Sequence, residues 1–323
     1  MLEGQTIEFE DVQFEVPWGY VVGRWYGNRK VRPLLALHGW QDNLGTWDRL
    51  IPLLPRHIGY LCIDLPGQGR SSKYPLGMIY HVIDYVHIVA RIVQEYKWRK
   101  VSLMGHSMGG VVAFAYASLY PNKVDLLIQI DILKQPHRGK EYLLAMIRNG
   151  AEKTMVENER LQQLHKREPP SYTYEELEEV LHRGSKNSIA RENCKHVLNR
   201  SIMPSQLYPE KFYFSRDGRM KWYQEFSDEP GLAIEMAKRM RNVNYLLIKA
   251  SRTRHVTAEM EPIIKVIREY VPHFELHQVE GTHHVHLNNP EGVAKPVGRF
   301  ILKYRPASLD SWSMDYALKH SKL

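Results

Sequence analysis

A serine flanked by glycines stands at a change of pattern in the chain, within Gly105-His106-Ser107-Met108-Gly109. The apolar run Val101 to Met104 before it is typical of a buried strand, and Ser107 to Leu119 has the composition of a buried helix. A sharp strand-to-helix turn exposes the serine hydroxyl, and small flanking residues let the strand and the helix approach each other. The pentapeptide alone is a weak signal, because its residues are common. In this context it predicts that Ser107 is a nucleophile for acyl transfer.

A histidine suited to act as the base follows the last strand-like run, in Gly281-Thr282-His283-His284-Val285-His286. A general base must reach the serine hydroxyl, and a loop that leaves a neighbouring strand can deliver it. We favour His283 because it stands nearest to the end of that strand; His284 and His286 are interpreted as packing or supporting residues. A group of histidines also suggests zinc, but no carboxylate or Cys stands at suitable local spacing. We therefore expect neither a metal nor a cofactor.

The acid that would orient His283 is harder to place. The chain order serine, acid, histidine is the one expected, and the acid usually follows the strand that ends at Ala250. Here no carboxylate appears until Glu259. Asp131 stands at the carboxyl end of the preceding strand, and adjacent strands lie only about 4.8 Å apart. We therefore predict that Asp131 is the acid. One alternative is that Glu259 is the acid, and another is that Asp131 has only a structural role.

Two backbone N–H donors must hold the negative oxygen that develops in acyl transfer. The N–H of Met108, next to the nucleophile at the start of a helix, is one candidate. The loop His38-Gly39-Trp40-Gln41 follows another strand-like run and supplies the second, the N–H of Trp40. The candidate substrate-binding residues are His38, Gln41 and His106, although His38 also suits a bracing role in the loop.

The elements that must position these residues alternate between strand-like and helix-forming runs, which predicts an α/β fold with a mostly parallel eight-stranded sheet flanked by helices. The strands are expected at Ile7 to Val16 and Tyr20 to Tyr26, which form a hairpin, and at Pro33 to Leu37, Tyr60 to Asp64, Val101 to Met104, Leu126 to Asp131, Asn244 to Ala250 and Phe274 to Val279. The helices are expected at Trp47 to Leu54, Val82 to Glu95, Ser107 to Leu119, Glu259 to Tyr270 and Asn289 to Lys303.

A charged, helix-forming stretch interrupts this alternation. We interpret residues 1–132 and 242–305 as the core, 133–241 as an inserted helical lid and 306–323 as a C-terminal tail. The apolar residues of the insertion are equally suited to lining a cavity or to forming the lid's own core. They include Leu143, Met146, Leu177, Leu181 and Tyr208.

The composition sets further limits. The chain has 323 residues, of which 43% are hydrophobic, enough for a substantial core. Its net charge of +8 comes from scattered basic residues. Because the sequence has neither zinc-finger spacing nor an RNA-binding aromatic motif, we do not expect it to bind nucleic acid. A solvated surface, or attraction of an anionic substrate, explains the charge. Cys62 and Cys194 show no paired spacing, which favours a reducing compartment.

Targeting signals are confined to the end of the sequence. The start lacks the pattern of a cleaved signal, and the apolar runs are too short to span a bilayer, so no transmembrane segment is expected. The final Ser321-Lys322-Leu323 is a tripeptide read by the peroxisomal import receptor. We expect that receptor as a partner and a peroxisomal location, with the cytoplasm as a further possibility.

These motifs occur in the order found in the α/β-hydrolase superfamily, which the chain resembles. They include Leu37 to Trp40, Asp64 to Ser72, the Ser107 turn and the His283 segment. The segments TWDRLIPLLP, GHSMGGVV and NYLLIKA narrow the resemblance to the animal serine hydrolase-like proteins, often called kraken-like. The resemblance implies a Ser–acid–His triad and an often peroxisomal location.

The chain departs from the family pattern after Ala250, where relatives would be expected to carry an Asp. Some haloalkane dehalogenases place the acid after the preceding strand, which by resemblance implies Asp131. Their chemistry, and that of epoxide hydrolases, needs an Asp where this chain has Ser107. We therefore expect a serine hydrolase that cleaves a carboxylic ester or a related acyl bond in a small molecule. An acyl-CoA thioesterase, a lactonase, or a degenerate hydrolase that binds a ligand are the alternatives.

Overall fold

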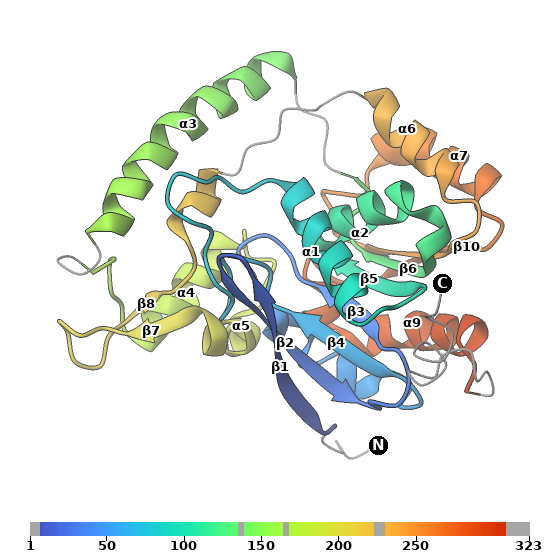
Figure 1. Ribbon diagram of the computed structural model, residues 1–323, viewed down its shortest axis with the longest axis horizontal. Coiled ribbons are helices and arrows are strands. Elements are labelled where there is room, and N and C mark those ends of the chain that lie inside the picture. Colours follow the sequence, from blue (N-terminus) through green and yellow to red (C-terminus); the bar gives the residue numbers. More distant parts are fainter. Residues whose placement is uncertain (1–6, 135–138, 164–167, 223–229, 308–323) are drawn as a thin grey trace.

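Eight strands form one central sheet in the order β1-β2-β4-β3-β5-β6-β9-β10 (Figure 1). The computed structural model describes residues 7–134, 139–163, 168–222 and 230–307. The pairs β1–β2 and β2–β4 are antiparallel and all other pairs in this sheet are parallel, which confirms the predicted mostly parallel sheet. The strands are β1 Phe9–Val16, β2 Gly19–Gly27, β3 Leu34–Leu37, β4 Gly59–Ile63, β5 Val101–His106, β6 Val124–Ile130, β9 Asn244–Ala250 and β10 Phe274–Val279.

Two apolar layers cover the faces of the sheet. One layer contains α1 (Val82–Glu95), α2 (Met108–Leu119), α6 (Pro230–Arg239) and α7 (Glu261–Tyr270). The other contains α9 (Pro290–Tyr304) and the segment around Trp47. Because both faces are covered, every residue of β3, β4, β5 and β6 is buried, and this burial accounts for the continuous apolar runs in the sequence.

One predicted helix was wrong. Residues 47–54 do not form a continuous α-helix; the chain makes two short 3₁₀ helices, η1 (Leu44–Trp47) and η2 (Ile51–Leu53). Pro52 lies in the first turn of η2 and Pro55 follows its end. Because proline lacks a backbone N–H and restricts the residue before it, this spacing leaves no room for a longer helix.

The chain between β6 and β9 stands apart from the main sheet over much of its length (Figure 1). It contains α3 (Lys140–Gln162), α4 (Tyr174–Gly184), α5 (Cys194–Ser201) and α6. It also contains an antiparallel ribbon that the sequence did not suggest, β7 (Ile202–Pro204) with β8 (Phe212–Phe214). Leu177 is fully buried in a small separate core, with Leu181 packed against it. A short α8 (Val285–Asn288) follows β10.

Two sequence-based expectations concern the environment of the protein. Among the residues that the structure describes, no helix is both long enough and apolar enough to cross a bilayer. The tripeptide Ser321 to Leu323 lies outside the described residues.

Candidate active site

Ser107 occupies a sharp turn between β5 and α2. Its backbone has φ 51° and ψ −122°, a conformation that costs a residue with a side chain about 1–3 kcal/mol. The glycines beside it are sterically required. A Cβ at Gly105 would lie 2.3 Å from the Gly109 carbonyl oxygen, and one at Gly109 would lie 2.2 Å from the Leu37 carbonyl oxygen. The turn is therefore the strained strand-to-helix connection expected of a nucleophile elbow.

Asp131 and His283 come together although 152 positions separate them in the chain. Asp131 Oδ2 lies 2.8 Å from His283 Nδ1, and Oδ1 accepts a hydrogen bond of 2.9 Å from the Ala250 N–H. The aspartate is completely buried and has φ 52°, so its side chain turns from the end of β6 toward β9. A carboxylate at this place holds the Nδ1–H of a neutral imidazole, which leaves Nε2 free to accept a proton.

In the described part of the chain, no hydrogen bond or ion pair joins the alternative acid to this histidine. Glu259 is exposed, in the short 3₁₀ helix η6 (Ala258–Met260). The loop after β9 instead brings His255 against the base, with its ring centroid 4.0 Å from that of His283 and an angle of 37° between the planes. The structure thus pairs Asp131, and not Glu259, with His283.

His38 and His106 are fully buried behind the site. His38 Nε2 accepts a hydrogen bond of 2.9 Å from the Leu65 N–H, and its Nδ1 lies 2.8 Å from the Gly39 carbonyl oxygen. Burial lowers the pKa of His38 to about 4. His106 Nε2 lies 3.0 Å from the carbonyl oxygen of His283. Both side chains contact backbone groups in this way, and the substrate-binding role suggested for them stays a prediction.

The loop that was expected to help hold the oxyanion lies against the nucleophile. A Cβ at Gly39 would stand 3.3 Å from the Ser107 Cβ. In the described part of the chain, the backbone N–H groups of Trp40 and Met108 have no hydrogen-bond acceptor. The Trp40 indole donates a 2.9 Å hydrogen bond to the carbonyl of Met220, which fixes the loop to the inserted segment. This arrangement leaves both predicted donors available to an oxyanion.

A cavity of about 480 Å³ opens at Ser107. Most of its wall is apolar or aromatic and comes from both the core and α3. The sequence analysis assigned the apolar residues of the insertion either to a cavity wall or to the lid's own core. Met146 lies in the wall of this cavity, whereas Leu177 and Leu181 lie in the core of the insertion. The structure places His38, Gln41 and His106 outside the wall. The lining residues are Trp40, Val82, Ser107, Met108, Val111, Ile132, Tyr142, Ala145, Met146, Asn149, Gly150, Lys221, Trp222 and His255.

Sequence reasoning missed His255 and Trp222 as wall residues. His255 had a usable signal, because it follows β9 within a few residues and the carboxyl ends of parallel strands gather at the edge of the sheet where ligands bind. Trp222 had none, since its position in the wall depends on how the inserted segment folds back over the core.

Comparisons with known proteins identify the family to which the chain belongs. Residues 32–157 match the family model described as the alpha/beta hydrolase fold. A "Probable serine hydrolase" of Drosophila melanogaster is 35% identical, over 91% of this chain and 88% of its own length. A "Serine hydrolase-like protein" of Danio rerio is 30% identical, over 94% and 91%. A hypothetical protein of Pseudomonas aeruginosa of known structure is 25% identical, with a TM-score of 0.75 over 91% of this chain and 99% of its own. The chain therefore belongs to the α/β-hydrolase superfamily, among the serine hydrolase-like proteins.

Proposed function

We propose that this protein is a serine esterase that hydrolyses carboxylic esters of small molecules through an acyl-enzyme. The observation that carries the proposal is the 2.8 Å contact between Asp131 and His283 at the edge of the sheet that also carries the Ser107 turn. A buried carboxylate, an imidazole and a strained serine in one place are the parts that acyl transfer needs.

The proposed reaction has two halves. In the first, Ser107 Oγ attacks the ester carbonyl while His283 Nε2 takes the hydroxyl proton, and the oxyanion is held by the N–H groups of Trp40 and Met108. The carbon–oxygen bond to the alcohol then breaks, and His283 returns the proton to the leaving alcohol. In the second half, water attacks the acyl-serine with the same base, which releases the acid and restores Ser107. Asp131 stabilises the imidazolium in each half.

The wall of the 480 Å³ cavity supports an acyl group that is apolar and short to medium in length. Val82, Val111, Ile132 and Met146 supply aliphatic surface, and Trp222 supplies an aromatic face. A volume of about 480 Å³ is within the range of small-molecule sites. The direct test is a series of p-nitrophenyl esters of increasing acyl length, together with labelling by a fluorophosphonate.

We expect the rate of hydrolysis to rise and then fall as the acyl chain lengthens. We also expect rapid labelling by the fluorophosphonate, which should be lost in Ser107→Ala. Absence of both turnover and labelling in folded protein would contradict it. That outcome would favour the second class of function, a ligand-binding protein that keeps the cavity without an activated serine.

A second candidate, thioester hydrolysis with a phosphate-bearing leaving group, is favoured by a larger cavity of about 1240 Å³. Lys221 lines both this cavity and the one at Ser107. Two acids in its wall already have partners, since Glu157 pairs with Arg160 at 2.8 Å and Glu168 bonds to Ser205 at 2.6 Å. The basic residues of the wall are Arg70, Lys73, Arg160, Arg200, Arg216 and Lys221.

Arg216 is the residue of this wall best placed to recognise an anion. It stacks on Phe214 at 4.1 Å, and no acid among the described residues pairs with it. Its Nε has no hydrogen-bond partner in the described part of the chain, and desolvation alone lowers its pKa to about 10. An unpaired guanidinium beside an open cavity is well suited to phosphate.

The two candidates can be separated with two thioesters that share an acyl group. Butyryl-CoA carries phosphates, whereas the butyryl thioester of N-acetylcysteamine does not. If the larger cavity binds the leaving group, Arg216→Met should raise the KM for butyryl-CoA about tenfold, because one hydrogen bond to a charged group is lost. The KM for the smaller thioester should stay unchanged. The control is Arg241→Met, which removes a cation outside both cavities. Equal effects on both thioesters would exclude this role.

A further inference from the structure

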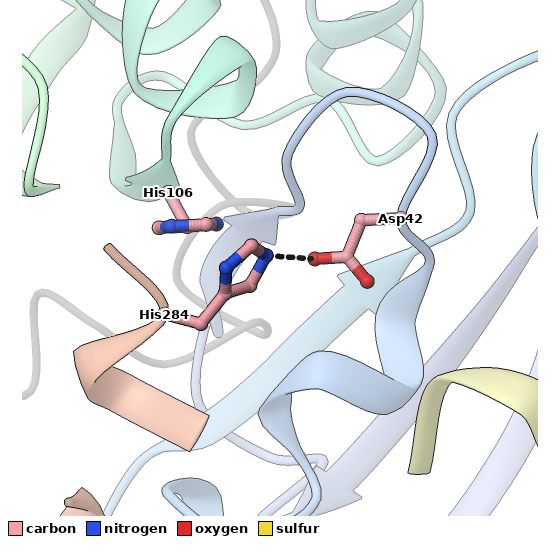
Figure 2. Close-up of side chains that lie close together, drawn as sticks. All are labelled: Asp42, His106 and His284. Carbon is pink, nitrogen blue, oxygen red and sulfur yellow. Dashed lines mark ion pairs between the residues drawn. The ribbon is translucent and has the colours of Figure 1, made fainter. Parts of the chain in front are cut away.

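A cluster of imidazoles lies directly behind the proposed triad, and a carboxylate reaches it from a distant loop. The ring of His106 packs against that of His284, with the centroids 4.7 Å apart and an angle of 54° between the planes. Figure 2 shows the His284 ring between His106 and Asp42, with its Nε2 3.9 Å from Asp42 Oδ2. One ligand atom from each of these three residues lies within 4.8 Å of the others. The carboxylate that the local sequence around the histidines lacked is thus supplied by Asp42.

The hydrogen bonds around the three side chains leave suitable lone pairs unused. His106 Nε2 is held by the His283 carbonyl and His284 Nδ1 by Ser188 Oγ, at 3.0 and 2.6 Å. Each of these contacts leaves the other ring nitrogen free to bind a cation. His106 Nδ1 and Asp42 Oδ2 are buried and have no hydrogen-bond partner in the described part of the chain. Leaving such groups unpaired inside a protein is costly.

We propose that Asp42, His106 and His284 form a binding site for one divalent transition metal ion of the zinc type. Two imidazole nitrogens and one carboxylate oxygen are a donor set that Zn²⁺ accepts at about 2.0–2.2 Å. Donors at that distance from one ion lie about 3.5 Å apart, so the side chains must close by about 1 Å from the present separation. The contacts of each imidazole with an oxygen of Ser188 or His283 are the outer hydrogen bonds that usually orient ligating histidines.

The electrostatics of the site agree with this assignment. Burial, the largest cause, holds the pKa of His106 and His284 well below the ordinary value, which favours the neutral form of an imidazole that can bind a metal ion. Burial, the largest cause, raises the pKa of Asp42 to about 7. His284 Nε2 lies 3.9 Å from Asp42 Oδ2, a distance longer than a hydrogen bond. A divalent ion would place positive charge beside this buried carboxyl and would select its deprotonated form.

The three ligands belong to the three segments that carry the proposed chemistry. His106 immediately precedes Ser107, His284 immediately follows His283, and Asp42 lies two positions after Trp40. An ion at this site would therefore tie the nucleophile turn, the base loop and the oxyanion loop to one another. The site does not depend on the proposed esterase activity, so its test uses binding and stability.

The experiment measures metal binding by the full chain after treatment with EDTA. Zn²⁺ is titrated in competition with a chromophoric chelator. Co²⁺ is added separately because its visible absorption is much stronger in a four-coordinate protein site than in six-coordinate aqueous Co²⁺. We expect one tight site per chain and a Zn²⁺-dependent rise in melting temperature. Asp42→Asn and His284→Gln should each weaken binding about 100-fold or more.

His277→Gln is the matched control, because it removes a partly exposed histidine on β10 that lies outside the cluster. It should leave binding unchanged. If the ligand variants do not fold, Ser188→Ala replaces them, since it removes only the hydrogen bond to His284 and should weaken binding about 10–100-fold. The proposal is overturned if EDTA-treated wild type takes up no Zn²⁺ at micromolar concentration. It is equally overturned if the affinity is the same in Asp42→Asn, His284→Gln and Ser188→Ala as in the wild type.

Discussion

Replacing Asp131 by Asn tests the proposed mechanism most sharply, because it changes one buried atom and almost no volume. In the wild type, one carboxylate oxygen accepts the Ala250 N–H at 2.9 Å and the other faces His283 Nδ1 at 2.8 Å. An asparagine has only one acceptor oxygen. The Ala250 N–H has a fixed direction in β9, so the amide oxygen must turn toward it, and the amide NH₂ then faces His283.

This arrangement selects the wrong form of the imidazole. With an NH₂ donor facing it, Nδ1 must be the unprotonated nitrogen, and the proton moves to Nε2, which can no longer accept the proton of Ser107. The variant also loses the negative charge that stabilises the imidazolium. In a well-studied serine protease the corresponding change lowers turnover about 10⁴-fold, which is about 5.4 kcal/mol in the activation free energy. We expect a loss of similar size here.

The assay is the initial rate of p-nitrophenyl butyrate hydrolysis, with the rate of fluorophosphonate labelling as a second readout. Glu259→Gln is the matched control, because it makes the same chemical change at an exposed carboxyl of the neighbouring loop. It should retain activity within about twofold of the wild type. A loss below about tenfold in folded Asp131→Asn, or a larger loss in Glu259→Gln, would refute the assignment of the acid.

Three further predictions concern the elbow and the buried His38. Ser107→Ala and Ser107→Gly should both be inactive, but the glycine variant should be more stable by about 1 kcal/mol in urea unfolding, because φ 51° suits glycine; equal stability would contradict the strain. Gly109→Ala should cost at least about 2 kcal/mol, since its Cβ would meet the Leu37 carbonyl at 2.2 Å; a thermal melt unchanged from the wild type would argue against that packing. His38 has a folded pKa of about 4, below the ordinary 6.5, so the unfolded chain binds an extra proton between these values. Stability should therefore fall as pH drops from about 6.5 to about 4, by up to about 1.4 kcal/mol per pH unit, and His38→Gln should reduce this slope in urea unfolding at several pH values.

Much of the architecture could be predicted from the sequence because it depends on local pattern. Strands that are buried on both faces must be apolar throughout, so β3 to β6 are visible as runs, and α1 spans the predicted residues Val82 to Glu95. The Ser107 turn could also be located, since its glycines are required by contacts with immediately adjoining elements. The prediction of a helix at 47–54 was wrong because it used only the spacing of the apolar residues. The prolines near this segment limit the length of a helix, whatever that spacing is.

Only the tertiary structure decided which distant side chains meet. Asp131, rather than Glu259, lies beside His283 because β6 and β9 are neighbours and because the backbone at Asp131 turns its side chain across that pair. Asp42 reaches His284 from a loop more than two hundred positions away, and Trp222 reaches the cavity only when the inserted segment folds back over the sheet. Contacts of this kind depend on strand order, register and loop path. Local composition does not encode them, because a side chain finds its partner only after the elements between them have packed.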